Sequence, residues 1–129
     1  MIFVTCAIIR KEGGLILAAQ RPPDSHLAGK WEFPGGKIAD GETEEACIVR
    51  EIREELGIEI QTGSRLRPST HDYGEKVIQL IPFECEVVSG VPEAREHAAL
   101  QWVDQSNLDT LDWCEADVPI VEQIRQILT

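Results

Sequence analysis

The stretch GKIADGETEEACIVREIREELGI, residues Gly36–Ile58, contains six glutamates among its twenty-three residues. Thr43 stands before two of these glutamates, which is the usual order of an N-cap residue and an acidic first turn. Gly57 follows Leu56 and supplies a C-terminal stop. The pattern therefore predicts an acidic helix that ends at about Leu56.

Three glutamates of this helix are spaced so that their carboxylates share one face. Glu51, Glu54 and Glu55 stand at i, i+3 and i+4. Two such charges about 4 Å apart repel by about 1 kcal/mol in water and by about 4 kcal/mol at an effective dielectric constant of about 20. A solvated acidic surface is one interpretation. The other is a site for Mg²⁺, or for Mn²⁺ in its place, because both ions prefer oxygen ligands. Arg50 is suited to orienting one of the carboxylates.

Nine positions of the stretch fit the spacing G-x5-E-x7-R-E-U-x-E-E-x-G-U, in which U is an aliphatic residue. They are Gly36, Glu42, Arg50, Glu51, Ile52, Glu54, Glu55, Gly57 and Ile58. This spacing resembles the signature of the Nudix hydrolases and is called the Nudix box below. The neighbouring GGK is not a P-loop, because Trp31 and Ile38 occupy the places of its first glycine and its Ser or Thr.

The resemblance extends over nearly the whole chain. The segments DSHLAGKWEFPGGK, EHAALQW and ADVPI look like the MutT branch of the family. This resemblance implies a Mg²⁺-dependent nucleoside triphosphate pyrophosphohydrolase that cuts between the α- and β-phosphates and releases a nucleoside monophosphate and pyrophosphate. It also implies the Nudix fold.

The remaining pattern predicts an α/β (α+β) fold, with a mixed β-sheet sandwiched between α-helices. A hairpin is expected from Phe3–Ile9 and Leu15–Ala19, because a Gly-Gly turn separates two apolar runs. Further strands are expected at Ile58–Arg67, Val77–Val88 and Leu100–Val103. A second helix, with Asp117 as its N-cap, would present Ile120, Ile124, Ile127 and Leu128 at helical spacing. We expect residues 1–129 to form a single domain.

The resemblance also implies a set of metal ligands. Gly35 would offer its backbone carbonyl, and Glu51, Glu54 and Glu55 their carboxylates. Glu96 falls where the family often has a further acidic ligand, although an exposed loop residue is the alternative there. Glu51 is our first candidate for the base that activates water, and Glu96 is its rival.

The substrate side is implied in the same way. Arg21 and Lys37 match basic positions that meet phosphates, and His26 matches a histidine near the ligand. All three side chains would otherwise be ordinary surface groups. Three further residues, Glu32, Phe33 and Pro34, fall in the segment that contacts the base, largely through main-chain groups.

Asp117 is where the chain departs from MutT, which carries an asparagine at this position. An ionised aspartate only accepts hydrogen bonds. It would suit the N4 amino group of cytosine, or the N1–H and amino group of a guanine-type base. The segment DSHLAGK resembles MutT proteins that remove 8-oxo-dGTP, whereas ADVPI and EHAALQW resemble the branch that acts on cytidine nucleotides. The resemblance therefore implies 8-oxo-dGTP as the first expected substrate, with CTP, dCTP or 5-methyl-dCTP as the alternative. A non-catalytic Nudix-fold binding module is a further alternative, opposed by the intact box.

Composition limits the partners. A formal net charge of −11 argues against binding to polymeric nucleic acid, which needs clustered Lys and Arg.

The chain has no apolar run of the roughly 20 residues that would cross a membrane. Its four cysteines are widely spaced, as expected for buried free thiols rather than a zinc site or disulfides. We expect a cytoplasmic enzyme that acts on a small nucleotide, as a monomer or homodimer.

Overall fold

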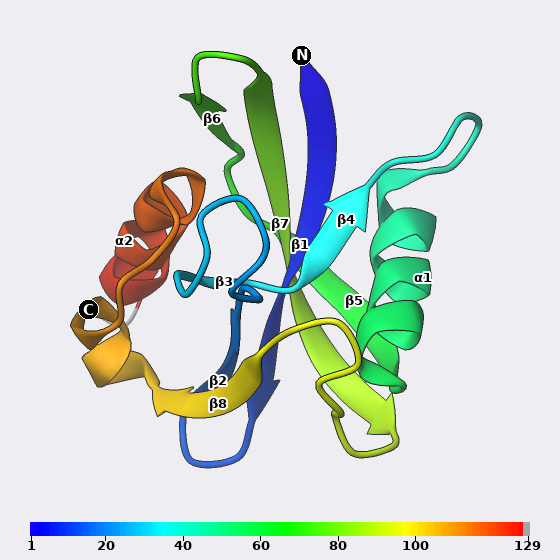
Figure 1. Ribbon diagram of the computed structural model, residues 1–129. Coiled ribbons are helices and arrows are strands. Elements are labelled where there is room, and N and C mark those ends of the chain that lie inside the picture. The colour runs from blue at the N-terminus through cyan, green and yellow to red at the C-terminus, as the bar shows by residue number, and fades with distance from the viewer. Residues whose placement is uncertain (128–129) are drawn as a thin grey trace.

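The computed structural model describes residues 1–127, in which eight strands form one sheet flanked by two α-helices (Figure 1). The elements follow in the order β1 (Ile2–Lys11), β2 (Leu15–Gln20), β3 (Trp31–Glu32), β4 (Gly35–Lys37), α1 (Glu44–Leu56), β5 (Glu59–Arg65), β6 (Ser69–Asp72), β7 (Val77–Ser89), β8 (Ala99–Asp104), the 3₁₀ helices η1 (Gln105–Thr110) and η2 (Glu115–Asp117), and α2 (Val118–Ile127).

Strand β1 is the centre of the sheet. It pairs in parallel with β7 over Ile2–Arg10 and antiparallel with β4, while its pairing with β2 is confined to the residues beside the turn. The order β3-β2-β1-β7-β5 results, with β8 added on β2 and β6 on β7. Because β1 is covered on both faces, its apolar residues run continuously instead of alternating with polar ones.

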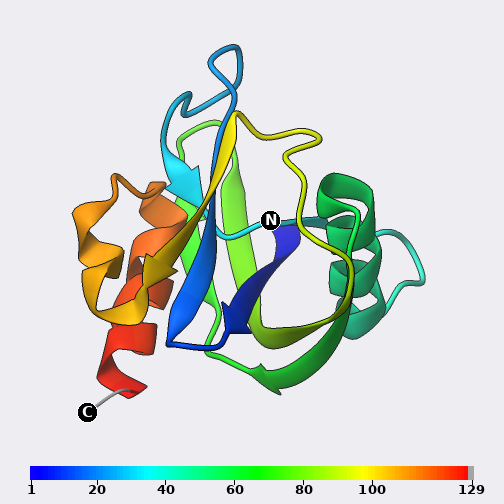
Figure 2. The same cartoon turned by 90° about the horizontal axis from the view of Figure 1, so that it is seen from below.

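Two apolar cores lie on the two faces of the sheet. Ile48, Ile52 and Leu56 of α1 pack on one face, while α2 packs on the other. Figures 1 and 2 show the two helices on opposite sides of the sheet. The predicted mixed sheet between helices is therefore confirmed. Within the described residues, no helix is long and apolar enough to span a membrane.

The ends of α1 are as the sequence predicts. The Thr43 hydroxyl accepts a hydrogen bond from the N–H of Ala46 at 3.1 Å. Gly57 has a φ of 70°, in the left-handed region, and donates its N–H to the carbonyl of Arg53 at 3.0 Å. Both contacts are local, so the helix boundaries could be predicted from neighbouring residues alone.

Several features differ from the sequence pattern. The segment before α1 forms β3 and β4, and β6, η1 and η2 are additional elements. The predicted N-cap role of Asp117 is wrong. Asp117 ends η2, which runs directly into α2, and its Oδ2 accepts a hydrogen bond from the N–H of Phe33 at 3.0 Å. The side chain of Asp117 therefore bonds to the segment between β3 and β4 instead of capping α2. The predicted helical position Leu128 lies outside the described residues.

All four cysteines are buried and free, as predicted. Cys6 and Cys85 each belong to one of the two cores, where their thiols pack as small apolar side chains. The thiol of Cys47 contacts the backbone carbonyls of Gly36 and Lys37. Burial raises the pKa of Cys85 and Cys114 to about 12 in each case, so both stay protonated near neutral pH.

Strand β4 lies so close to its neighbours that two glycines have no room for a side chain. A Cβ at Gly35 would lie 1.9 Å from the backbone oxygen of Thr5 in β1. A Cβ at Gly36 would lie 2.3 Å from the carboxylate of Glu51 in α1. These two residues therefore allow the acidic helix and the central strand to approach each other.

We predict that Gly35→Ala lowers the free energy of unfolding by about 3 kcal/mol, because the added methyl group overlaps backbone that cannot move aside. Urea unfolding followed by circular dichroism measures this. Gly63→Ala is the control, since its Cβ would lie 3.3 Å from the nearest atom, the carbonyl oxygen of Glu84. Equal stability losses in the two variants would contradict the close approach of β4 to β1.

Candidate functional site

The guanidinium of Arg50 joins three carboxylates of the Nudix box. Its Nε lies 2.6 Å from Oε2 of Glu42, and one Nη lies 2.9 Å from the other oxygen of the same carboxylate. Its other Nη lies 2.9 Å from Glu51 and 3.2 Å from Glu54. The bond from Arg50, aided by the N–H of Ala39, lowers the pKa of Glu42 to about 2. Arg50 therefore orients carboxylates, as its planar fork of donors allows.

Glu55 stands apart from this pairing. Its side chain is only 9% exposed and is not among the carboxylates that Arg50 bonds within residues 1–127. Burial, followed by hydrogen bonding to Glu51 and repulsion from Glu51, Glu32 and Glu96, raises the pKa of Glu55 to about 10. The region around Glu55 thus holds more negative charge than its own cations balance.

This excess of negative charge fits a divalent cation. The donors are all oxygen atoms, which suits Mg²⁺ or Mn²⁺ better than zinc or copper. The close approach of Gly36 to the Glu51 carboxylate leaves that carboxylate beside the β4 backbone. Among residues 1–127, no three His, Cys, Asp or Glu side chains are already arranged to hold a metal. Glu51 and Glu54 are bonded to Arg50 instead.

Glu96 lies beside this cluster on the segment that connects β7 and β8. Backbone bonds hold that segment to α1, from the N–H of Glu93 to the carbonyl of Leu56 and from the N–H of Arg95 to the carbonyl of Glu55. Glu96 itself is exposed, and its charge contributes to the raised pKa of Glu55. The structure thus brings the box and this distant acidic residue into one electrostatic neighbourhood.

A cavity of about 260 Å³ lies next to the box, on the α2 side of β1 and β4. Most of the substrate-side residues predicted from the sequence border it. Its lining includes Arg21, His26, Glu32, Phe33, Gly35, Lys37 and Asp117. With the basic side chains of Arg21 and Lys37 and the acidic side chain of Asp117 in its lining, the cavity suits a small nucleotide.

Arg21 is held at the mouth of this cavity. Its Nη1 donates to Glu32 at 3.0 Å, and its Nε donates to the backbone carbonyl of His26 at 2.6 Å. The ring of His26 in turn meets Tyr73 edge to face, with ring centroids 5.6 Å apart. Lys37 is exposed on β4 and makes no ion pair within the described chain. Its charge is therefore available to a ligand.

Asp117 forms a buried wall of the cavity and is 4% exposed. Burial, and secondarily the charge of Glu32, raises the pKa of Asp117 well above its ordinary value, although the N–H of Phe33 opposes this shift. A protonated carboxyl group donates as well as accepts. Asp117 can therefore act as a donor as well as an acceptor, in contrast to the ionised acceptor expected from the sequence.

Two predicted base-contact residues already use main-chain groups inside the protein. The N–H of Phe33 donates to Asp117, and the carbonyl of Pro34 accepts from the N–H of Ala7 at 2.8 Å. Pro34 is buried and does not border the cavity. The ring of Phe33 packs on Trp113, with centroids 4.6 Å apart.

Comparison with known proteins decides the family. The family model of the NUDIX domain matches residues 5–123. The chain belongs to the NUDIX domain family. This match confirms the hydrolase family predicted from the box.

Three similar proteins illustrate the relationship. A putative 8-oxo-dGTP diphosphatase 2 from Mycobacterium tuberculosis is 41% identical over 119 residues, which cover 90% of this chain and 82% of that protein. The CTP pyrophosphohydrolase of Escherichia coli is 38% identical over 122 residues, covering 95% and 90%. The crystal structure of a MutT protein from Methanosarcina mazei superimposes with a TM-score of 0.87 at 29% identity, covering 99% and 95%.

The sequence analysis of this Nudix domain missed three residues of the site. Tyr73 and Lys76 border the cavity from the turn between β6 and β7, and no local pattern indicates this. His97 places its Nε2 2.9 Å from Glu32 and 3.8 Å from Glu55. His97 directly follows Glu96, a predicted metal ligand, and this position could have indicated that His97 lies near the site.

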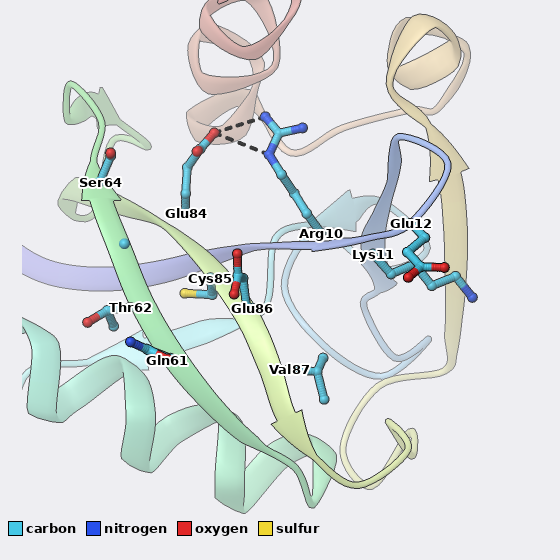
Figure 3. A pocket seen from close by; sticks show the side chains of 11 residues that line it. Arg10, Lys11, Glu12, Gln61, Thr62, Ser64, Glu84, Cys85, Glu86 and Val87 are labelled. Atoms are coloured by element: carbon cyan, nitrogen blue, oxygen red, sulfur yellow. Dashed lines mark hydrogen bonds and ion pairs between the residues drawn. The ribbon is translucent and has the colours of Figure 1, made fainter.

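A larger hollow of the Nudix domain lies elsewhere. It measures about 790 Å³ and crosses β1, β5 and β7 (Figure 3). Figure 3 shows the guanidinium of Arg10 bonded to Glu84, and Arg10 also donates to Gln105. Glu12 and Glu86 add negative charge. With its arginine already paired, this surface is less suited to a nucleotide than the smaller cavity beside the box.

We predict a pH-dependent stability contribution from Glu42. The pKa of Glu42 in the folded protein is about 2, below its ordinary 4.5. The stabilisation is therefore fully present above pH 4.5 and is lost as the pH falls toward 2. Thermal unfolding of Glu42→Gln between pH 6 and 3 tests this, since its deficit relative to the parent protein should shrink with acidification.

Glu75→Gln is the control for this measurement, because Glu75 is exposed in the β6–β7 turn. Its difference in melting temperature from the parent should stay small throughout. A Glu42→Gln deficit that stayed constant from pH 6 to 3 would show that the Arg50 pair does not stabilise the fold.

Proposed function

We propose that this protein is a Mg²⁺-dependent nucleoside triphosphate pyrophosphohydrolase of the MutT type. It would convert its substrate to a nucleoside monophosphate and pyrophosphate, by a single domain spanning residues 1–129. The observation that carries the proposal is the carboxylate cluster of α1, in which Glu55 is buried, beside a cavity bordered by Arg21 and Lys37.

The carboxylates of Glu51, Glu54 and Glu55 would hold the metal, with the carbonyl of Gly35 and the carboxylate of Glu96 as further ligands. The bound metal would neutralise phosphate charge and make water a better nucleophile. Arg50 keeps Glu51 and Glu54 oriented. Glu51 would accept the proton of the attacking water, and Glu96 is the rival for that role. Mn²⁺ would serve in place of Mg²⁺.

The nucleotide would lie in the cavity with its phosphates toward the Nudix box and its base toward Asp117. Arg21 and Lys37 would meet phosphate oxygens near the box, and His26 would close the mouth of the cavity. The base would reach Phe33 and Asp117, beside the main chain of Glu32 and Pro34. Pro34 would act by shaping this segment, because its carbonyl is bonded to β1.

We propose 8-oxo-dGTP as the first substrate, so that the enzyme would remove oxidised nucleotides before they enter DNA. A protonated Asp117 would donate to O6 and accept from N7–H of 8-oxoguanine. The same group would donate to N3 and accept from the N4 amino group of cytosine. CTP, dCTP or 5-methyl-dCTP is therefore the second candidate, favoured by the similarity to the E. coli CTP pyrophosphohydrolase.

The proposed setting is cytoplasmic, with a monomer or homodimer as the working form. The net charge of −11 disfavours polymeric nucleic acid as a ligand. A free nucleotide remains compatible with this charge, because local cations and a metal determine the field inside the cavity.

We predict that Glu55→Gln lowers kcat/KM by about 100-fold or more while the fold is retained, because it removes a metal ligand from a buried site. Pyrophosphate release with Mg²⁺ measures activity, and calorimetric titration with Mn²⁺ measures the metal site directly. Glu45→Gln is the matched control, since Glu45 is exposed in the first turn of the same helix. Undiminished activity in folded Glu55→Gln would refute the metal-site assignment.

We predict that Asp117→Asn changes the ratio of kcat/KM for dCTP over 8-oxo-dGTP by about tenfold, or about 1.4 kcal/mol. The amide always carries a donor, whereas the carboxyl group of Asp117 can also ionise and then only accept hydrogen bonds. Steady-state kinetics with 8-oxo-dGTP, dGTP, dCTP and 5-methyl-dCTP measures the ratio. Asp112→Asn is the control, because the side chain of Asp112 is 77% exposed. An unchanged ratio would remove Asp117 from base recognition.

A further inference from the structure

His97 lies between the two halves of the candidate site. Its side chain is only 5% exposed, and its Nε2 lies 2.9 Å from Oε2 of Glu32 and 3.8 Å from Oε1 of Glu55. An ionised carboxylate only accepts hydrogen bonds, so the bond to Glu32 is donated by the N–H of His97. The imidazole thus separates a carboxylate beside the cavity from a carboxylate of the Nudix box.

The main chain fixes the position of this ring from both sides. The N–H of Glu93 donates to the carbonyl of Leu56 at the end of α1, at 2.9 Å. The N–H of Ala98 donates to the carbonyl of Gln20 at the end of β2, also at 2.9 Å. His97 is therefore held across the gap between the helix that carries the box and the strand that leads to Arg21.

The second ring nitrogen of His97 is a separate indication that this side chain has a function beyond packing. Within residues 1–127, Nδ1 of His97 is buried and has no hydrogen-bond partner. Buried polar atoms are normally satisfied, and an exception calls for an explanation. Packing alone would be served better by an apolar side chain. The contact made by Nε2 is the interaction that requires an imidazole here.

Glu32 receives a donor on each of its two oxygens. Oε2 accepts from His97, and Oε1 accepts from Nη1 of Arg21 at 3.0 Å. We propose that His97 is a positioning residue, which holds Glu32 against Arg21 and keeps this pair apart from Glu55. The inference rests on the proposed function, in which Arg21 meets the phosphates and Glu55 holds the metal.

Removing the imidazole would free one oxygen of Glu32 and leave two carboxylates facing each other across the vacated space. Arg21 would lose the fixed partner that aims it at the cavity. Nucleotide binding should therefore weaken more than the chemical step, because Arg21 acts in binding. Supporting contacts of this kind typically contribute 10-fold to 100-fold.

Three substitutions separate this role from packing. In His97→Gln the amide nitrogen reaches the place of Nε2 and can donate to Glu32. In His97→Asn the amide reaches only as far as Nδ1, and His97→Leu has no donor. We expect His97→Asn and His97→Leu to raise KM about tenfold with kcat within about threefold of the parent. His97→Gln should stay within about threefold in both constants.

Direct binding supplies a readout besides activity. Calorimetric titration with dCMP and 8-oxo-dGMP should show the same tenfold weakening in His97→Asn and recovery in His97→Gln. Glu32→Gln tests the contact from its other side and is informative even if His97→Leu fails to fold. The double variant Glu32→Gln/His97→Asn should be no worse than Glu32→Gln alone, because both changes break one contact.

An unchanged KM in folded His97→Asn, a His97→Gln variant as impaired as His97→Leu, or additive losses in the double variant would each overturn the inference. Failure of the proposed function looks different. The parent protein would then hydrolyse none of the triphosphates, whereas the pattern of monophosphate binding among the His97 variants would still report on the contact.

Discussion

The pairing of Arg50 with the carboxylates of α1 is the interaction on which the rest of the site depends. Without it, glutamates on one helical turn would repel one another and turn outward into solvent. Arg50 also donates to the backbone carbonyl of Lys37 at 3.3 Å, which ties the helix to β4. Gly35 lets β4 pack closely on β1, and Gly36 leaves room beside β4 for the carboxylate of Glu51. A charged group and two glycines thus bring the box beside the central strand, where the cavity begins.

Charge is distributed unevenly over the site. Arg50 compensates Glu42, Glu51 and Glu54, whereas Glu55 is buried among other carboxylates, which raise its pKa. Such an environment is unfavourable for the protein alone and becomes favourable when a cation is bound. The cavity next to it is bordered by Lys37 and Lys76. A protein with a net charge of −11 can therefore still offer a local field that suits a polyphosphate.

In the proposed function, binding and catalysis would use different parts of the fold. The Nudix box runs from β4 through α1, and the spacing of its residues Arg50, Glu51, Glu54 and Glu55 follows from the helical repeat. The cavity is assembled from β1, β4, the β6–β7 turn and η2, which are far apart in the chain. The segment between β7 and β8 joins the two parts through its bonds to α1 and β2. In the proposed function, changes in the cavity wall would therefore alter the preferred base without disturbing the carboxylates of the helix.

The sequence by itself determined the acidic helix, its caps at Thr43 and Gly57, the Nudix box and the presence of helices on both faces of the sheet. These features depend on neighbouring residues or on a regular apolar pattern, and both can be recognised in the amino-acid sequence alone. The tertiary structure decided the partners of Asp117 and His97. Asp117 bonds to Phe33, 84 positions away, and His97 to Glu32, 65 positions away. No local pattern encodes such pairs, because they form only after packing has excluded water and left each polar group with the nearest available partner.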